Sequence, residues 1–197
     1  MENKFELLYD LLKKDRSYRR FDETFKIEKS TLENLIGLTR FCASGRNLQP
    51  LKYYLVNDPE KCETIFPLLK WAGYLTDWDG PVKGERPTAY IIQCLDTNLT
   101  KNYLCDDGIQ LQTITLGAVS LGLGCCIIKS FNAIQLRDEV KLPEHLEPLY
   151  IIAVGKPVEK VVIENMRKGE EDKIIYYRTP DGIHHVPKRA LEELLIN

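Results

Sequence analysis

The sequence predicts a single domain of mixed α-helical and β-strand structure. The chain has 197 residues, 44% of them hydrophobic and 28% charged, which suits one globular unit with a core of its own. Some segments place apolar residues at helical spacing, and others carry short apolar runs typical of buried strands. A run of small residues from Asp106 to Leu123 predicts a long central helix. The sequence contains no internal repeat and no interdomain linker, so we expect one domain over residues 1–197.

The first third of the chain is expected to hold three helices and one strand. In chain order these cover residues 5–12, 30–42, 53–56 and 59–70. Ser30 and Glu33 have the spacing of a capping box and predict where the second helix begins. Asp58 and Pro59 are the residue types preferred at the N-cap and first position of the third helix.

Residues 71–87 form an irregular excursion rich in aromatic side chains. Connections of this length more often act as functional lids than as spacers. Trp71, Tyr74 and Trp78 are therefore candidates for a substrate pocket, because flat rings suit a flat organic molecule. The same three side chains would equally serve to pin the excursion to the core, and the sequence favours neither interpretation.

The remaining elements alternate between strands and helices. Strands are predicted at 89–94, 125–128 and 149–154, a hairpin at 174–186 and a short helix at 190–196. Gly117, Ala118 and Ser120 give the central helix little side-chain bulk, so another backbone can approach it closely. Successive His184 and His185 would point to opposite faces of their strand, which excludes a chelating pair.

Composition argues against several classes of function. A net charge of −2 lacks the basic field of a nucleic-acid-binding surface. The longest weakly polar run, 114–128, is shorter than the ~18 apolar residues of a membrane helix, and residues 1–6 lack the apolar core of a signal peptide. We therefore expect a cytoplasmic protein.

Metal binding and side-chain catalysis are also disfavoured. The six cysteines show no CxxC spacing and no pairing with histidines, so we expect reduced, mainly buried thiols; a redox role for Cys125 and Cys126 is the less favoured alternative. Catalytic Ser-His-Asp order, HExxH, Walker and GxGxxG patterns are absent from the sequence. We therefore name no side chain as acid, base or nucleophile and predict no metal.

Two basic clusters predict an anion site instead. One is Arg16-Ser17-Tyr18-Arg19-Arg20-Phe21, and the other is Pro187-Lys188-Arg189. Arg offers a planar fork of donors, Ser a hydroxyl and Lys a point charge, which together suit a phosphate. A phosphate-bearing cofactor is the first candidate ligand.

Over nearly the whole chain the sequence resembles the nitroreductase family of flavin mononucleotide (FMN) enzymes. The resemblance rests on the two basic clusters, on residues 43–50 (Ala-Ser-Gly-Arg-Asn-Leu-Gln-Pro), on 121–124 (Leu-Gly-Leu-Gly) and on 155–157 (Gly-Lys-Pro). It implies an α+β fold with a mostly antiparallel central sheet wrapped by helices. It also implies a long buried central helix and an interlocked homodimer.

The resemblance further implies which residues bind the flavin. Arg16 and Ser17 match residues that hold its phosphate and ribityl chain, and Lys188 and Arg189 would close on the same phosphate. Arg19 matches the basic residue near the pyrimidine edge of the ring, where a cation stabilises negative charge on the reduced flavin.

Two further segments match residues around the flavin ring. Ser44, Gly45 and Asn47 match a loop that reaches the flavin from the other subunit of the dimer. A second segment matches a turn beside the reactive nitrogen of the ring; it comprises Ile128, Lys129 and Ser130. The sequence departs from many relatives at Leu51, Lys129 and Gly45, which bears on substrate choice before flavin binding.

The function implied is hydride transfer from NADH or NADPH, through bound FMN, to a small organic acceptor such as a nitroaromatic or quinone. The kinetics would be ping-pong. Alternatives are a flavin-binding or sensor protein without turnover, and a family member with other flavin chemistry, such as reductive dehalogenation or contraction of the flavin ring.

Overall fold

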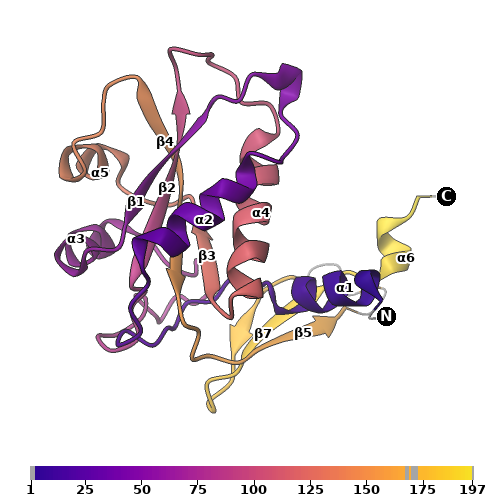
Figure 1. Ribbon diagram of the computed structural model, residues 1–197. Helices are drawn as coiled ribbons and strands as arrows, with labels where there is room; N and C mark the ends of the chain where they lie inside the picture. Colours follow the sequence, from indigo (N-terminus) through magenta and orange to yellow (C-terminus); the bar gives the residue numbers. More distant parts are fainter. Residues whose placement is uncertain (1–2, 167–168, 170–172, 197) are drawn as a thin grey trace.

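The computed structural model describes residues 3–166, 169 and 173–196 (Figure 1). Its centre is an antiparallel sheet in the order β1-β2-β4-β3. The strands are β1 (Leu51–Val56), β2 (Ala89–Asp96), β3 (Gly124–Ile128) and β4 (Leu146–Gly155). The α+β class and the antiparallel central sheet are thereby confirmed.

Helices cover both faces of this sheet (Figure 1). On one face α2 (Lys29–Thr39) and α4 (Asp106–Ser120) pack through an apolar cluster that includes Leu35 and Ile114. On the other face α3 (Pro59–Ile65) and α5 (Ala133–Glu139) pack through a second cluster that includes Ile65 and Leu136. The strands are therefore buried on both sides, and β2 is apolar along most of its length.

The predicted close approach to the central helix occurs at Gly117. A Cβ atom there would lie 2.5 Å from Cδ1 of Leu38 and 3.0 Å from Cδ2 of Leu35, both on α2. A larger residue would therefore force the side chains of Leu35 and Leu38 to shift.

A second group of elements lies to one side of the central sheet (Figure 1). It comprises α1 (Lys4–Lys14), β5 (Val161–Asn165), β6 (Tyr177–Arg178), β7 (His184–Lys188) and α6 (Leu191–Leu194). β7 pairs in parallel with β5 and antiparallel with β6. The predicted hairpin is present, although its first strand is only two residues long. None of the residues of α1 is buried.

Several predicted boundaries were wrong. α2 begins at Lys29 and its N-cap, Glu28, makes no side-chain capping bond, so the capping box at Ser30 does not form. α3 ends at Ile65, where a 3-10 turn, η2 (Phe66–Leu68), accommodates Pro67. The central helix ends at Ser120, and the last helix covers 191–194 only. Neither α5 nor β5 was predicted from the sequence.

Residues 71–87 contain turns and bends without helix or strand, as expected. Asp58 caps α3 as predicted, accepting from the backbone N of Lys61 at 2.9 Å with Pro59 in the first turn. Within the described residues, no helix is long and apolar enough to cross a membrane.

Candidate functional site

The segment Arg16–Phe21 leaves α1 and runs along the open edge of the central sheet. Ser17 forms a parallel bridge with Cys125 of β3, and the N–H of Tyr18 donates to the Cys125 carbonyl at 2.9 Å. Two paired glycines, Gly124 and Gly155, make room for the aromatic rings of the segment. A Cβ on Gly124 would lie 2.6 Å from Cδ2 of Tyr18. Gly124 is therefore needed for close packing.

Asp15 anchors the start of this segment to α4. Its carboxylate accepts a 2.8 Å bond from the hydroxyl of Thr115 and a second bond from the side-chain amide of Gln112. Burial raises the pKa of Asp15, and the two hydrogen bonds oppose that rise.

Arg19 lies in a buried polar cluster where the motif meets β7. Its Nη1 is 3.2 Å from both the Ser17 carbonyl and Nε2 of His184. Its guanidinium also stacks over the ring of Tyr176, 4.8 Å from the centroid. A side chain that would ordinarily extend into solvent is thereby held in one orientation, with only 9% of its surface exposed.

His184 is neutral in this arrangement. A guanidinium only donates hydrogen bonds, so Nε2 of His184 is the acceptor and its proton resides on Nδ1. Burial, followed by the charges of Arg19 and Arg178, lowers the pKa of His184 to about 4.

Glu159 supplies the negative charge of the cluster. Its buried carboxylate accepts from the backbone N–H of Arg19 and from Nη2 of Arg178 at 3.1 Å. Arg178 in turn stacks over Trp78, 4.6 Å from the ring centroid. The basic motif, the 71–87 excursion and the C-terminal hairpin therefore meet at one point.

Two arginines of the basic motif retain donors without a partner in the described residues, as does Arg178 beside them. In the part of the chain that the structure describes, the buried Nε atoms of Arg16 and Arg19 have no hydrogen-bond partner. Arg16 uses Nη2 to donate to the Leu12 carbonyl at 2.7 Å. Buried donors are nearly always paired, so these atoms mark a place where an acceptor from outside the chain can bind.

The end of β3 continues the same edge. Ile128 is buried and pairs with Ile151, whereas Lys129 and Ser130 are exposed. Nζ of Lys129 donates to the hydroxyl of Tyr150 at 3.2 Å, and this bond raises the pKa of the lysine. The predicted ring-side residues therefore follow the same strand, β3, that the basic motif contacts at Cys125.

The 44–47 loop lies elsewhere, at the first residue of α4. Asp106 accepts from the Ser44 hydroxyl at 2.6 Å and from the Gly45 N–H at 2.8 Å. Asn47 has a positive φ of 56°, a conformation that Asn tolerates. A Cβ on Gly45 would collide with Cδ1 of Leu104, so a Ser at this position would require the Leu104 side chain to move.

The structure separates this loop from the motif within one chain. Asp106 holds the loop at one end of α4, and Thr115 holds Asp15 nine residues further along. A helix rises 1.5 Å per residue, so the two anchoring points are roughly 13 Å apart.

Lys188 and Arg189 lie at the far end of β7 from the Arg19 contact. His184 begins this strand and Lys188 ends it, a span of roughly 13 Å along an extended chain. Arg189 forms an ion pair with Glu193 at 3.2 Å.

The three candidate aromatic residues occupy different surroundings. Trp71 is buried and packs near Phe66, with ring centroids 5.9 Å apart. Trp78 is half-buried beneath Arg178, and exposed Tyr74 meets the ring of Tyr176 edge-on at 5.0 Å. All three therefore contact the protein itself, and whether any of them also contacts substrate stays a prediction.

The residues that position the motif were not predicted from the sequence. His184 and Glu159 are far from the motif along the chain, and Asp15 looks like an ordinary helix-end acid. The same is true of Asp106, which holds the 44–47 loop. The strand alternation that directs His184 and His185 to opposite faces was the one usable signal.

Metal and thiol chemistry find no support in the described residues, which contain no group of three or more potential metal ligands. Burial raises the pKa of the Cys126 thiol to about 11 and that of Cys125 well above its usual value. Neither thiol is therefore activated as a nucleophile.

A sequence model of the Nitroreductase family matches residues 12–86 and 104–156, more than half of the chain. The matched ranges include the basic motif, the 44–47 loop and residues 128–130, and they exclude Lys188 and Arg189.

Solved structures show the same fold. A candidate NADH dehydrogenase/NAD(P)H nitroreductase from Parabacteroides distasonis ATCC 8503 is similar with a TM-score of 0.67 and 24% identity, covering 86% of this chain and 96% of that one. An FMN-dependent nitroreductase from Clostridium difficile R20291 gives a TM-score of 0.63 and 22% identity, covering 86% and 98%. A nitroreductase family protein from Clostridium novyi NT gives 0.63 and 19%, covering 94% and 97%.

Proposed function

The chain belongs to the nitroreductase family, and from this premise we propose that it is an FMN-dependent oxidoreductase. It would pass hydride from NADH or NADPH to a small organic acceptor such as a nitroaromatic or quinone. Bound FMN would supply the hydride chemistry, and the chain would supply its position and electrostatics.

The observation that carries the proposal is the pair of orphaned guanidinium nitrogens. The buried Nε atoms of Arg16 and Arg19 lack partners among the described residues. A phosphate and the oxygen and nitrogen atoms of a flavin pyrimidine ring are acceptors of the kind these donors need. Arg16 would hold the phosphate with Ser17, and Arg19 would face the pyrimidine edge.

Arg19 is preorganised for this role. Its Nη1 is already engaged with Ser17 and His184, so the donors on its opposite side remain for a ligand. A fixed cation stabilises negative charge without reorganisation, which favours the reduced cofactor. Ile128, Lys129 and Ser130 would border the ring at the end of β3.

A homodimer is part of the proposal. Ser44, Gly45 and Asn47 are separated from the motif within one chain, so a partner subunit would bring its own copy of this loop to the flavin. The apolar residues of α1 support a partner surface, since Phe5 is 68% exposed and Leu8 is 47% exposed. Lys188 and Arg189 would close on the phosphate.

The proposed compartment is the cytoplasm, where the free cysteines would stay reduced. The proposed partners are small molecules and a second copy of the chain, with no role for a membrane or a nucleic acid.

The first experiment is a visible absorption spectrum of the purified protein supplied with FMN, followed by anaerobic addition of NADH and then NADPH. We expect flavin absorption bands that bleach on addition of one or both donors. Bands that persist would favour a flavin-binding protein without turnover. A protein that takes up no FMN would contradict the proposal.

A further inference from the structure

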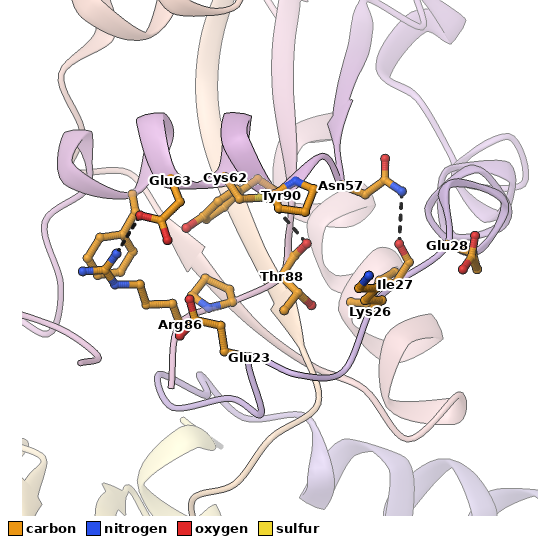
Figure 2. Close-up of a pocket in the computed structure, with 13 residues that line it drawn as sticks. Glu23, Lys26, Ile27, Glu28, Asn57, Cys62, Glu63, Arg86, Thr88 and Tyr90 are labelled. Atoms are coloured by element: carbon orange, nitrogen blue, oxygen red, sulfur yellow. Dashed lines mark hydrogen bonds and ion pairs between the residues drawn. The ribbon is translucent and has the colours of Figure 1, made fainter. Parts of the chain in front are cut away.

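A cavity of about 360 Å³ lies away from the β3 edge, between α3 and two segments that contain Ile27 and Arg86 (Figure 2). Its floor is Tyr90 of β2, which is two strands away from Cys126 through Ala153 of β4. The cavity shares no lining residue with the candidate flavin site. Its volume falls within the range of small-molecule pockets.

Tyr90 brings an unpaired donor to this cavity. The side chain is fully buried, and its hydroxyl has no hydrogen-bond partner among the residues that the structure describes. Burial raises the pKa of Tyr90 well above its usual value, so the hydroxyl stays protonated and able to donate. A buried hydroxyl without a partner is rare in folded proteins.

Arg86 brings a second unpaired donor to the cavity. Its Nη1 pairs with Glu63 at 3.2 Å, and its guanidinium stacks 4.2 Å above the ring of Phe66. Its Nε is buried and has no partner within the described ranges. Tyr90 on β2 and Arg86 in the preceding loop therefore each provide an unpaired donor at the same cavity.

The remaining walls define the body of the ligand. Ile27, Pro59, Phe66 and Pro87 offer apolar surface, while the Cys62 thiol is occupied by the Thr88 carbonyl at 3.5 Å. An aromatic or aliphatic body fits these walls, with an acceptor atom directed toward Tyr90 and Arg86.

The charged residues that line the cavity disfavour an anionic ligand. The lining includes the carboxylates Glu23, Glu28 and Glu63 against the cations Lys26 and Arg86. Glu63 lies beside Arg86, so a ligand carboxylate approaching Arg86 would meet a like charge at close range. A neutral oxygen acceptor avoids this repulsion.

We propose that this cavity binds a small neutral carbonyl compound, such as an aryl ketone, whose oxygen accepts from Tyr90 and Arg86. The site is separate from the proposed flavin site and does not depend on it.

Three probes of similar shape test the chemistry. Acetophenone carries the neutral carbonyl, ethylbenzene lacks the oxygen, and benzoate carries a charge. Each is titrated to its solubility limit into full-length protein supplied with FMN, and the amide resonances of Thr88, Ala89 and Ile91 are followed. We expect acetophenone to shift these resonances and to bind at least about tenfold more tightly than benzoate, because benzoate faces Glu63.

Tyr90→Phe tests the hydroxyl, with Tyr177→Phe on exposed β6 as the matched control. Tyr90→Phe should weaken acetophenone binding about five- to tenfold, whereas ethylbenzene binding should not change and Tyr177→Phe should bind acetophenone as the unmodified protein does. Equal acetophenone affinity in Tyr90→Phe, or resonances that acetophenone leaves unmoved, would overturn the proposal.

Stability provides an independent readout. Because the hydroxyl has no partner among the described residues, Tyr90→Phe should not lower the thermal midpoint of the ligand-free protein. A midpoint clearly below that of the unmodified protein would show that the hydroxyl is already paired within the protein, and the proposal would be wrong.

Discussion

Nη1 of Arg19 lies 3.2 Å from Nε2 of His184, a contact between residues 165 positions apart in the chain. The contact ties the basic motif at the β3 edge to the first residue of β7. It also fixes the orientation of the guanidinium. The C-terminal hairpin therefore positions a residue that the N-terminal motif supplies.

Arg19→Gln should lower the reduction potential of bound FMN, because the fixed cation near the pyrimidine edge is lost. A charged hydrogen bond of ordinary strength corresponds to about 30–60 mV for a two-electron couple. The potential is measured by anaerobic dye equilibration. Arg20→Gln is the control, since Arg20 pairs with Glu85. Equal potentials in the two variants would refute the role of Arg19.

The stability of the protein should fall as pH falls from about 6.5 to about 4. Unfolded His184 binds a proton below about 6.5, whereas folded His184 does so only below about 4, so acid favours the unfolded state in this window. The loss is about 3 kcal/mol at most, measured by urea unfolding across the window.

His184→Gln should flatten that pH dependence, and His145→Gln should leave it intact. Gln at 184 retains an acceptor for Arg19, so FMN affinity at neutral pH should change little. An unchanged pH profile in His184→Gln would assign the acid sensitivity to other groups.

Phe5→Glu combined with Leu8→Glu should disrupt the proposed homodimer. α1 buries none of its residues within one chain, and an isolated helix of 11 residues is only marginally stable in water. We expect a shift from dimer to monomer in sedimentation equilibrium and FMN binding weakened at least about tenfold. Lys4→Glu on the same helix is the control. A double variant that stays dimeric would place the interface elsewhere.

Asp106→Ala should loosen the 44–47 loop. The carboxylate accepts from both the Ser44 hydroxyl and the Gly45 N–H, and alanine removes both acceptor oxygens. Leaving the Gly45 N–H without its acceptor costs about 1–3 kcal/mol and should speed amide exchange at Gly45 about tenfold or more. Asp107→Ala serves as the control. Unaltered exchange at Gly45 would show that the loop is held by other contacts.

Local signals predicted much of the fold. The Asp58-Pro59 pair placed the start of α3 correctly, because capping chemistry acts over three residues. The apolar runs located all strands of the central sheet. Prediction failed where packing overrode such signals, as at Ser30, which lies inside a helix that begins at Lys29.

The sequence also identified the Arg16–Phe21 motif, which lies on the edge of the central sheet through the bridge between Ser17 and Cys125. Its role in binding flavin stays a prediction. The residues that hold the motif in place could not be predicted from the sequence. Glu159 follows the last central strand and contacts Arg19 across 140 positions, and no local pattern encodes so distant a contact.

The fold class, most of the main elements in their order and the identity of the basic motif could be predicted from the amino-acid sequence, because these depend on periodicity and residue type. Which donors are engaged within the chain follows from the tertiary structure. Among the described residues, the Nε atoms of Arg16 and Arg19 have no partner, whereas Arg20 is bound by Glu85. The physical reason is that hydrogen-bond satisfaction depends on distances between residues remote in the chain, which packing sets after the local structure has formed.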